Sequence, residues 1–155
     1  MALPKLDTPT YETQLPSTDE TIKYRPFLVK EQKVLMMAQE SDDETQITNA
    51  MMQLVSSCTF GKVDAATAPI FDVEHIFLKL RGVSVGQKVT VNITCPDDDK
   101  TQVKKEINLE DIQCSVDDTH TNIIELTPTI KLEMSYPTMS NSQGTTNSDT
   151  ETVFK

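Results

Sequence analysis

The sequence contains one arrangement of cysteines that could bind a metal ion. Cys95 and Cys114 lie near the ends of stretches in which apolar and polar residues alternate, as the cysteines of a zinc ribbon do. A zinc knuckle needs two thiolates in the spacing Cys-x-x-Cys, because two such thiolates can hold one tetrahedral ion. Here the sequence reads Cys95-Pro96-Asp97-Asp98, and no second pair completes a set of four ligands. We therefore expect half-buried free thiols and no structural metal.

The aspartates at positions 97–99 are the next candidate, because carboxylates are the ligands of calcium and magnesium. A calcium loop alternates its acidic residues and turns at a glycine, so that several oxygens converge on the ion. Three consecutive aspartates without a following glycine do not match that pattern. They predict a solvated hairpin tip that discourages edge-to-edge aggregation.

The histidines do not form a recognisable catalytic motif with a serine or a cysteine. His75 lies beside Asp72 and Lys79 on a predicted polar helix face, and His120 lies in a turn rich in Asp and Thr. The chain has no Gly-x-Ser-x-Gly sequence, and its 4 glycines form no phosphate-binding loop. We expect surface histidines, no bound cofactor and no enzyme activity.

A short segment combines the residue types that dominate protein interfaces. Tyr24, Arg25 and Phe27 lie within four positions, at a predicted junction between a hairpin and a helix. Arginine and aromatic residues are enriched at interface hot spots, and this predicts a partner-binding role for the three side chains. The alternative interpretation is that they belong to the ordinary core.

Methionines cluster on two successive predicted helices. Met36 and Met37 lie on the first helix, and Met51 and Met52 lie on the second. Methionine side chains tolerate irregular contacts, so a methionine-rich helix pair can form an adaptable binding groove. Packing inside the core is the alternative interpretation for these four residues.

Composition excludes several classes of function. The 155 residues include 14 Lys+Arg against 24 Asp+Glu, which gives a formal net charge of -10. Nucleic-acid binding requires clustered basic residues, so we expect no nucleic-acid partner. No apolar run reaches the roughly 18 residues of a membrane span, and we expect no membrane partner. Three cysteines leave one unpaired, which is typical of reduced thiols in a cytosol.

The apolar spacing predicts a hairpin over residues 9–28, followed by helices. The first helix covers 29–40, with an apolar stripe that includes Val34 and Met37. The second begins at a capping box with Ser41 as the N-cap and ends near Phe60-Gly61. The third covers 69–81, and its apolar stripe ends at Gly82.

Strands are predicted to follow the helices. Alternation over residues 88–95 and 103–109 indicates two paired strands, and a short turn follows at 108–112. The last predicted strand, 129–136, has Ile130, Leu132, Met134 and Tyr136 on one face. The expected fold is α+β: an N-terminal β-hairpin, two to three helices and then an antiparallel β-meander.

The domain organisation follows from composition. Residues 1–136 form one α+β domain, and 137–155 form a flexible Ser/Thr/Asn-rich linker with little to bury. So little follows this linker that we expect a natural continuation to be missing from the chain.

Two stretches resemble the T-even bacteriophage baseplate hub assembly proteins: IKYRPFLVKEQK at 22–33 and DVEHIFLKLRGVSVG at 72–86. The opening MALPKL and the hairpin that contains Tyr11 fit the same group, and the resemblance covers residues 1–136. Members of this family are usually longer, with a helical C-terminal part. Many carry a Cys-x-x-Cys knuckle where this chain has Cys95, so the resemblance implies that Cys95 and Cys114 are remnants of a zinc ribbon.

The resemblance implies a late phage protein that assembles the central hub of the tail baseplate. Its partners would be baseplate hub proteins, and it would act as a chaperone in the host bacterial cytoplasm or remain in the virion. A permanent structural subunit of the baseplate is therefore the main alternative. An acidic inhibitor that mimics DNA is less favoured, because the negative charges are spread among 14 basic residues.

Overall fold

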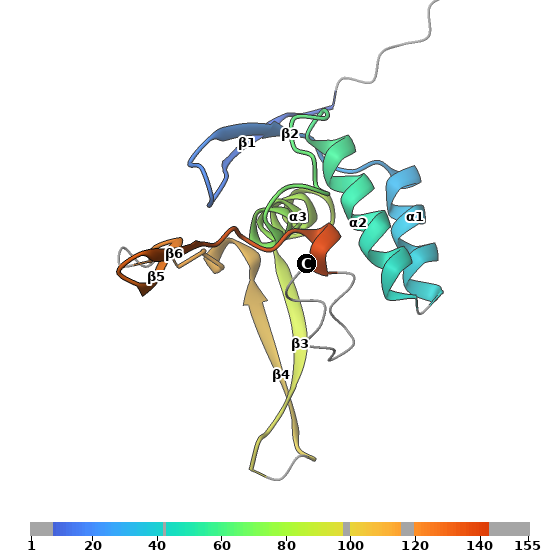
Figure 1. Cartoon of the computed structure of the whole chain (residues 1–155). Coiled ribbons are helices and arrows are strands. Elements are labelled where there is room, and N and C mark those ends of the chain that lie inside the picture. Colours follow the sequence, from blue (N-terminus) through green and yellow to red (C-terminus); the bar gives the residue numbers. More distant parts are fainter. Residues whose placement is uncertain (1–7, 42, 98–99, 116–119, 143–155) are drawn as a thin grey trace, which may run out of the picture.

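The computed structural model describes residues 8–41, 43–97, 100–115 and 120–142. A hairpin of two short strands is followed by three helices, two further hairpins and a short final helix (Figure 1). This order confirms the α+β class. The predicted tip residues Asp98 and Asp99 lie outside the described residues, as does most of the predicted C-terminal linker.

The N-terminal hairpin is confirmed. Strand β1 (Tyr11–Gln14) pairs antiparallel with β2 (Thr21–Tyr24), and Tyr11 lies opposite Tyr24. In the turn, the Leu15 amide donates to the Glu20 carbonyl oxygen (3.0 Å), and Asp19 adopts a left-handed conformation (φ 56°).

Helix α1 (Val29–Glu40) has the predicted bounds, but its apolar stripe is much less buried than the spacing predicted. Ala38 is the only buried residue of this helix, whereas Val34 and Met37 are exposed. The prediction was wrong for these two residues because α1 packs on α2 along one narrow side.

Helix α2 (Glu44–Cys58) begins at a different cap from the predicted one. The carboxylate of Asp43 accepts a hydrogen bond from the Thr45 amide (2.9 Å) and caps this helix. Ser41 instead ends α1, where its hydroxyl donates to the Ala38 carbonyl oxygen (2.7 Å). A free carboxylate is a strong cap, and a two-residue shift of the boundary satisfies both helix ends.

Helix α3 (Ile70–Ser84) continues past its predicted end at Gly82. No backbone approaches the position that a Cβ of Gly82 would occupy, and the residue keeps helical geometry. Gly86, which has a φ of 141°, follows the true end of the helix instead.

The core lies between α2, α3 and the first hairpin. It is built from side chains of α2 and α3 together with residues that flank them, among them Val55, Cys58, Ala65, Val73, Ile76 and Leu80, all with no exposed surface. Ile22 and Tyr24 extend this core into the hairpin.

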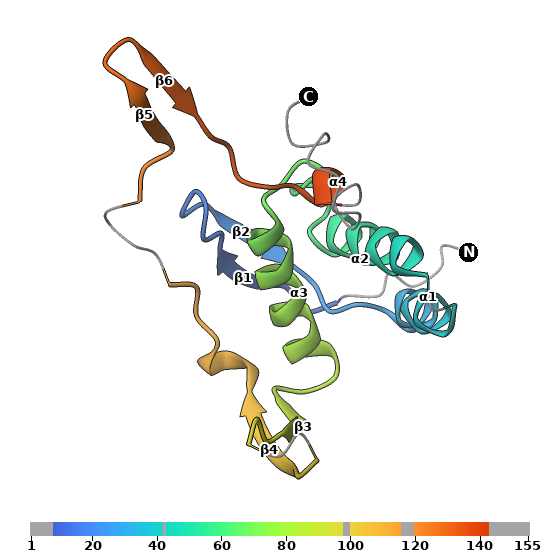
Figure 2. The same cartoon turned by 60° about the horizontal axis from the view of Figure 1, so that its bottom comes forward.

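The later strands form separate hairpins instead of one continuous meander. Strand β3 (Lys88–Thr94) pairs with β4 (Gln102–Asn108), and β5 (Ile123–Thr127) pairs with β6 (Ile130–Glu133). The single-turn helix η1 (Leu109–Asp111) follows β4 and confirms the predicted turn there. Figures 1 and 2 show both hairpins projecting away from the helices in different directions. Strand β5 was not predicted, because adjacent isoleucines interrupt its alternation.

The segment predicted to begin the linker packs on the core. Helix α4 (Met139–Ser142) follows Pro137, whose carbonyl oxygen accepts the Ile70 amide (3.0 Å). Met139 is buried in the core, and the Ser140 hydroxyl donates to the Ala66 carbonyl oxygen (2.8 Å). Residues 137–142 of the predicted linker are therefore held against the core, by the Met139 side chain and by these hydrogen bonds. Residues 143–155 lie outside the described part of the chain.

Candidate interaction surfaces

The predicted Arg25 site is already occupied by groups of the protein itself. Its guanidinium binds both carboxylate oxygens of Glu31, at 2.7 and 3.0 Å, and also contacts the Ser57 hydroxyl (3.2 Å). Glu31 additionally accepts the amide of Leu28 at the start of α1 (2.6 Å). The two charged side chains are only 13% and 11% exposed. Hydrogen bonding from Arg25 lowers the pKa of Glu31 to about 2, so the pair is fully charged at neutral pH.

Tyr24 and Phe27 also face inward. Tyr24 is buried, its ring lies 5.7 Å from that of Tyr11, and burial raises the pKa of its hydroxyl. Phe27 packs against the core, and its amide donates to the Ser84 hydroxyl (3.1 Å). Tyr24, Arg25 and Phe27 thus join the first hairpin to the helices. These contacts favour the core interpretation of the three residues, and their partner-binding role stays a prediction.

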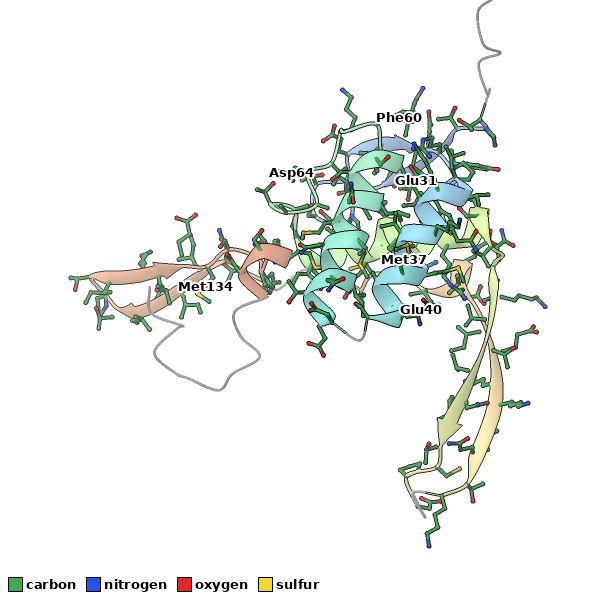
Figure 3. All side chains as sticks on the ribbon, turned by 90° about the vertical axis from the view of Figure 1, so that its right-hand side faces the viewer. Glu31, Met37, Glu40, Phe60, Asp64 and Met134 are labelled. Carbon is green, nitrogen blue, oxygen red and sulfur yellow. The ribbon has the colours of Figure 1, made fainter. Side chains whose placement is uncertain are left out.

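The four methionines do not line one groove. Met51 and Met52 of α2 are half-buried and pack against the core, whereas Met36 and Met37 of α1 are exposed. A groove of about 270 Å³ does run between α1 and α2, but it contains no methionine; it is lined by Lys30, Glu31, Val34, Ala50, Gln53, Leu54 and Ser57. Of the predicted methionine groove, only the outward face of α1 remains open to a partner (Figure 3).

The β5–β6 hairpin presents the most continuous exposed apolar surface of the described residues. Its register places Ile124 opposite Leu132, and alternation within and just after β6 adds Ile130 and Met134 to the same side. Leu126 lies at the register shift between Glu125 and Thr127, beside this row. We call these five exposed residues the apolar hairpin face: Ile124, Leu126, Ile130, Leu132 and Met134. Each of these side chains is between 44% and 61% exposed.

The opposite side of this hairpin is largely polar. Lys131 and Glu125 lie directly opposite each other and form an ion pair at 2.6 Å. Glu133 lies on the same side, opposite Ile123. The hairpin is therefore amphipathic. This pattern is typical of antiparallel strands that pack one face against protein and expose the other face to water.

Aromatic contacts attach the base of this hairpin to the body of the protein. The ring of Tyr136 makes an edge-on contact with Phe71 of α3 at a centroid distance of 4.9 Å. The ring of His120, which precedes β5 in the chain, stacks on the ring of Tyr136 at a centroid distance of 6.0 Å. Tyr136 was predicted to share one face with Ile130, Leu132 and Met134. Its ring instead contacts Phe71 and His120 at the base of the hairpin.

The β3–β4 hairpin has a smaller apolar row. Val89 pairs with Ile107 near its base, and both are half-buried. Ile93 pairs with Val103 near its tip, and both are exposed. This hairpin therefore buries one end of its apolar row and leaves only the other end open.

The predicted cysteine remnants are far apart. Cys95 follows β3 at the tip of its hairpin, so the seven residues of that strand, roughly 20 Å long, separate it from the hairpin base. Cys114 is exposed and lines a shallow pocket with Thr13 and His75 beside the first hairpin. No cluster of three metal-binding side chains occurs within the described ranges. Cys58 lies in the core, where burial raises the pKa of its thiol to about 11.

Sequence reasoning missed the polar contacts that hold the first hairpin. Asp72 and His75 were placed on a solvated helix face, but Asp72 is buried and binds both the amide (3.0 Å) and the hydroxyl of Ser17. His75 contacts the Thr13 hydroxyl (3.1 Å), and burial lowers the pKa of its imidazole. The available signal was the place of Asp72 in the first turn, directly beside the buried residue Val73.

Phe60 is a further residue that the spacing did not single out. It follows α2 with a φ of 57°, and its side chain is exposed. A left-handed conformation costs a residue other than glycine about 1–2 kcal/mol. Residues with a strained backbone are often found at functional sites. The exposed Phe60 side chain is therefore a candidate for contact with another protein.

Within the part of the chain that the structure describes, no helix is long and apolar enough to span a bilayer. Comparison with curated proteins and with solved structures gave no match. A family model described as the T4 bacteriophage base plate protein matches residues 8–155. The described surfaces are apolar hairpins and helix faces suited to contact other proteins, and the match spans nearly the whole chain. The chain therefore belongs to the T4 bacteriophage base plate protein family.

Proposed function

We propose that this protein is a phage tail assembly factor, a chaperone that binds a baseplate hub subunit by protein–protein contacts and catalyses no reaction. It would be made late in infection and act in the cytoplasm of the host bacterium. Membership of the baseplate family supports the general role. The observation that carries the proposal is the apolar hairpin face, which is exposed in the described part of the chain, on a hairpin that projects from the body of the protein (Figure 1).

Physical chemistry favours a binding role for such a surface. Five adjacent apolar side chains, each about half exposed, are costly to leave in water and gain stability when another surface covers them. A hub subunit before assembly exposes the surfaces that will later contact its neighbours. A protein with a complementary apolar face would cover one such surface until the next subunit displaces it.

The charge of the chain suits this role. The chain has a formal net charge of -10, which it would bring to a complex with an apolar subunit. Complexes that carry this charge repel one another, and this repulsion keeps them apart in solution. Most of the acidic side chains lie outside the apolar hairpin face, so the charge does not oppose docking there.

The test is to measure where the chain is found during infection. Finished tails and hub intermediates would be purified from infected bacteria, and this chain would be quantified in each by mass spectrometry. We expect it in the intermediates and not in finished tails. Its absence from the intermediates would overturn the proposal.

A permanent structural component of the baseplate is the second candidate. The observation that favours it is the presence of two projecting hairpins, each with exposed apolar residues, because a subunit locked among neighbours would cover both at once. The same experiment separates the two roles. Stoichiometric amounts of the chain in finished tails would support the role of permanent component and exclude the role of chaperone.

A further inference from the structure

Resting on the proposed function, we infer that the apolar hairpin face is the main docking surface of this protein. Its occupant is the apolar surface of a different baseplate protein, and not a second copy of this chain. The opposite side of the hairpin, with the Glu125–Lys131 pair, stays in water.

The first argument is that the hairpin lacks the cover that a two-stranded sheet needs. An isolated pair of strands is marginally stable in water and requires a third layer or a packed face. The first hairpin obtains such packing, because Ile22 and Tyr24 are buried in the core. No residue of the apolar hairpin face belongs to that core, although β5 and β6 contain more apolar residues than β1 and β2.

The second argument is that the hairpin is held in place at its base. The contact between Tyr136 and Phe71, at 4.9 Å, ties the end of the hairpin to α3. The Met134 amide also donates to the Asn122 carbonyl oxygen (2.7 Å), which extends the strand pairing toward that base. A face positioned in this way loses less freedom when a partner binds, and the affinity of docking benefits.

The third argument identifies the occupant. The five side chains present an apolar area on the order of 400 Å², so two copies packed face to face would bury roughly 800 Å². Stable and specific interfaces bury about 1,200 Å² or more, so this face alone does not support a dimer. Each copy also carries a formal net charge of -10, and the two charges repel. A different protein without this charge is not repelled, so it can add contacts around the face and bury the area that a stable interface needs.

The chain offers a closely matched pair of positions for a test. Ile123 and Ile124 are the same residue type, are adjacent in β5 and are 45% and 46% exposed. Ile124 belongs to the apolar hairpin face, whereas Ile123 lies on the opposite side, across from Glu133. A photo-crosslinking amino acid at position 124 or 123, in the full chain supplied to infected bacteria, would report on each side separately.

We expect position 124 to crosslink to another baseplate protein, identified by mass spectrometry, and position 123 to give at most a tenth of that yield. A crosslink from position 124 to a second copy, or to another segment of the same chain, would overturn the inference. Equal yields from the two positions, or none from either, would also overturn it. In these cases the proposed function stands if the chain is still found in hub intermediates, and it fails only if the chain is missing from them.

A substitution series gives an independent readout. Threonine keeps the β-branched shape of isoleucine, so the hairpin is retained while the surface becomes polar. We expect Ile124→Thr combined with Leu132→Thr to reduce the amount of chain recovered with hub intermediates by about tenfold or more. Ile123→Thr serves as the control and should leave recovery unchanged. Circular dichroism checks that both variants keep the wild-type fold, and equal recovery of folded variants would contradict the inference.

Discussion

At the scale of single residues, one ion pair decides the role of the hairpin–helix junction. Arg25 and Glu31 bind each other through two hydrogen bonds, and Glu31 also accepts the amide of Leu28, the N-cap residue of α1. Charged pairs of this geometry are the strong ones, because the planar guanidinium matches both carboxylate oxygens. An arginine that looked like an interface anchor therefore stabilises the monomer.

We expect Glu31→Gln to lower the free energy of unfolding by about 2 kcal/mol at pH 7, because it removes one partner of a part-buried charged pair. The effect also depends on pH. Since the pKa of Glu31 falls from 4.5 to about 2 in the folded protein, its contribution is complete above about pH 4.5. The contribution is lost as the pH falls toward 2. Urea denaturation at pH 7 and pH 3 measures both effects.

Glu40→Gln is the control for this prediction, since it removes the same charge from an exposed position at the other end of α1 (Figure 3). It should change the free energy of unfolding by no more than about 0.5 kcal/mol. If both variants were equally stable at pH 7, the ion pair would not have the structural role that its geometry indicates.

At the scale of elements, the first hairpin is attached to α3 by polar contacts from a helix that is otherwise apolar on its buried side. Asp72 accepts the amide and hydroxyl of Ser17, and His75 contacts Thr13. These contacts join residues more than 50 positions apart in the chain. They orient the hairpin so that Ile22 and Tyr24 enter the core.

Asp72→Ala is expected to cost about 2 kcal/mol of unfolding free energy, because the part-buried amide of Ser17 loses its acceptor. NMR should also show shifted amide signals throughout β1 and β2. The matched control is Asp64→Ala. Asp64 likewise accepts one amide, from Ala66, and one hydroxyl, from Thr67, but the bonds are exposed. A loss for Asp64→Ala as large as that for Asp72→Ala would show that burial is not the cause.

At the scale of the whole molecule, the protein combines a small core with two projecting hairpins. The core unites α2, α3, the first hairpin and Met139, whereas most side chains of β3–β4 and all of those in β5–β6 are exposed. A surface of this kind suits a protein whose partners complete its packing. It also means that stability is distributed unevenly along the chain.

Hydrogen exchange should reveal this distribution. We expect the amides of β5–β6 to exchange much faster than those of α2 and α3, because few buried side chains resist opening of that hairpin. Amides of β3–β4 should lie between, since Val89 and Ile107 are half-buried at its base. Native-state exchange followed by NMR measures all three groups in one experiment. Protection of β5–β6 equal to that of α3 would contradict the uneven distribution.

By itself the sequence determined the local elements and the family. Period-two alternation predicted the strands β3, β4 and β6, apolar spacing predicted three helices, and α1 was predicted with its observed bounds. These features depend on neighbours a few residues away, which a sequence shows directly. Helix ends and β5 were less predictable, because several polar residues compete as caps and two adjacent isoleucines break the alternation.

Only the tertiary structure decided which of these surfaces are free to bind. Alternation predicts that Ile130 and Leu132 share a face, but it cannot show whether another element covers that face. The same limit applies to Tyr24 and Arg25, whose residue types suit an interface and a core equally well. Burial depends on packing between segments far apart in the chain, such as Asp72 against Ser17, and no local pattern contains that information.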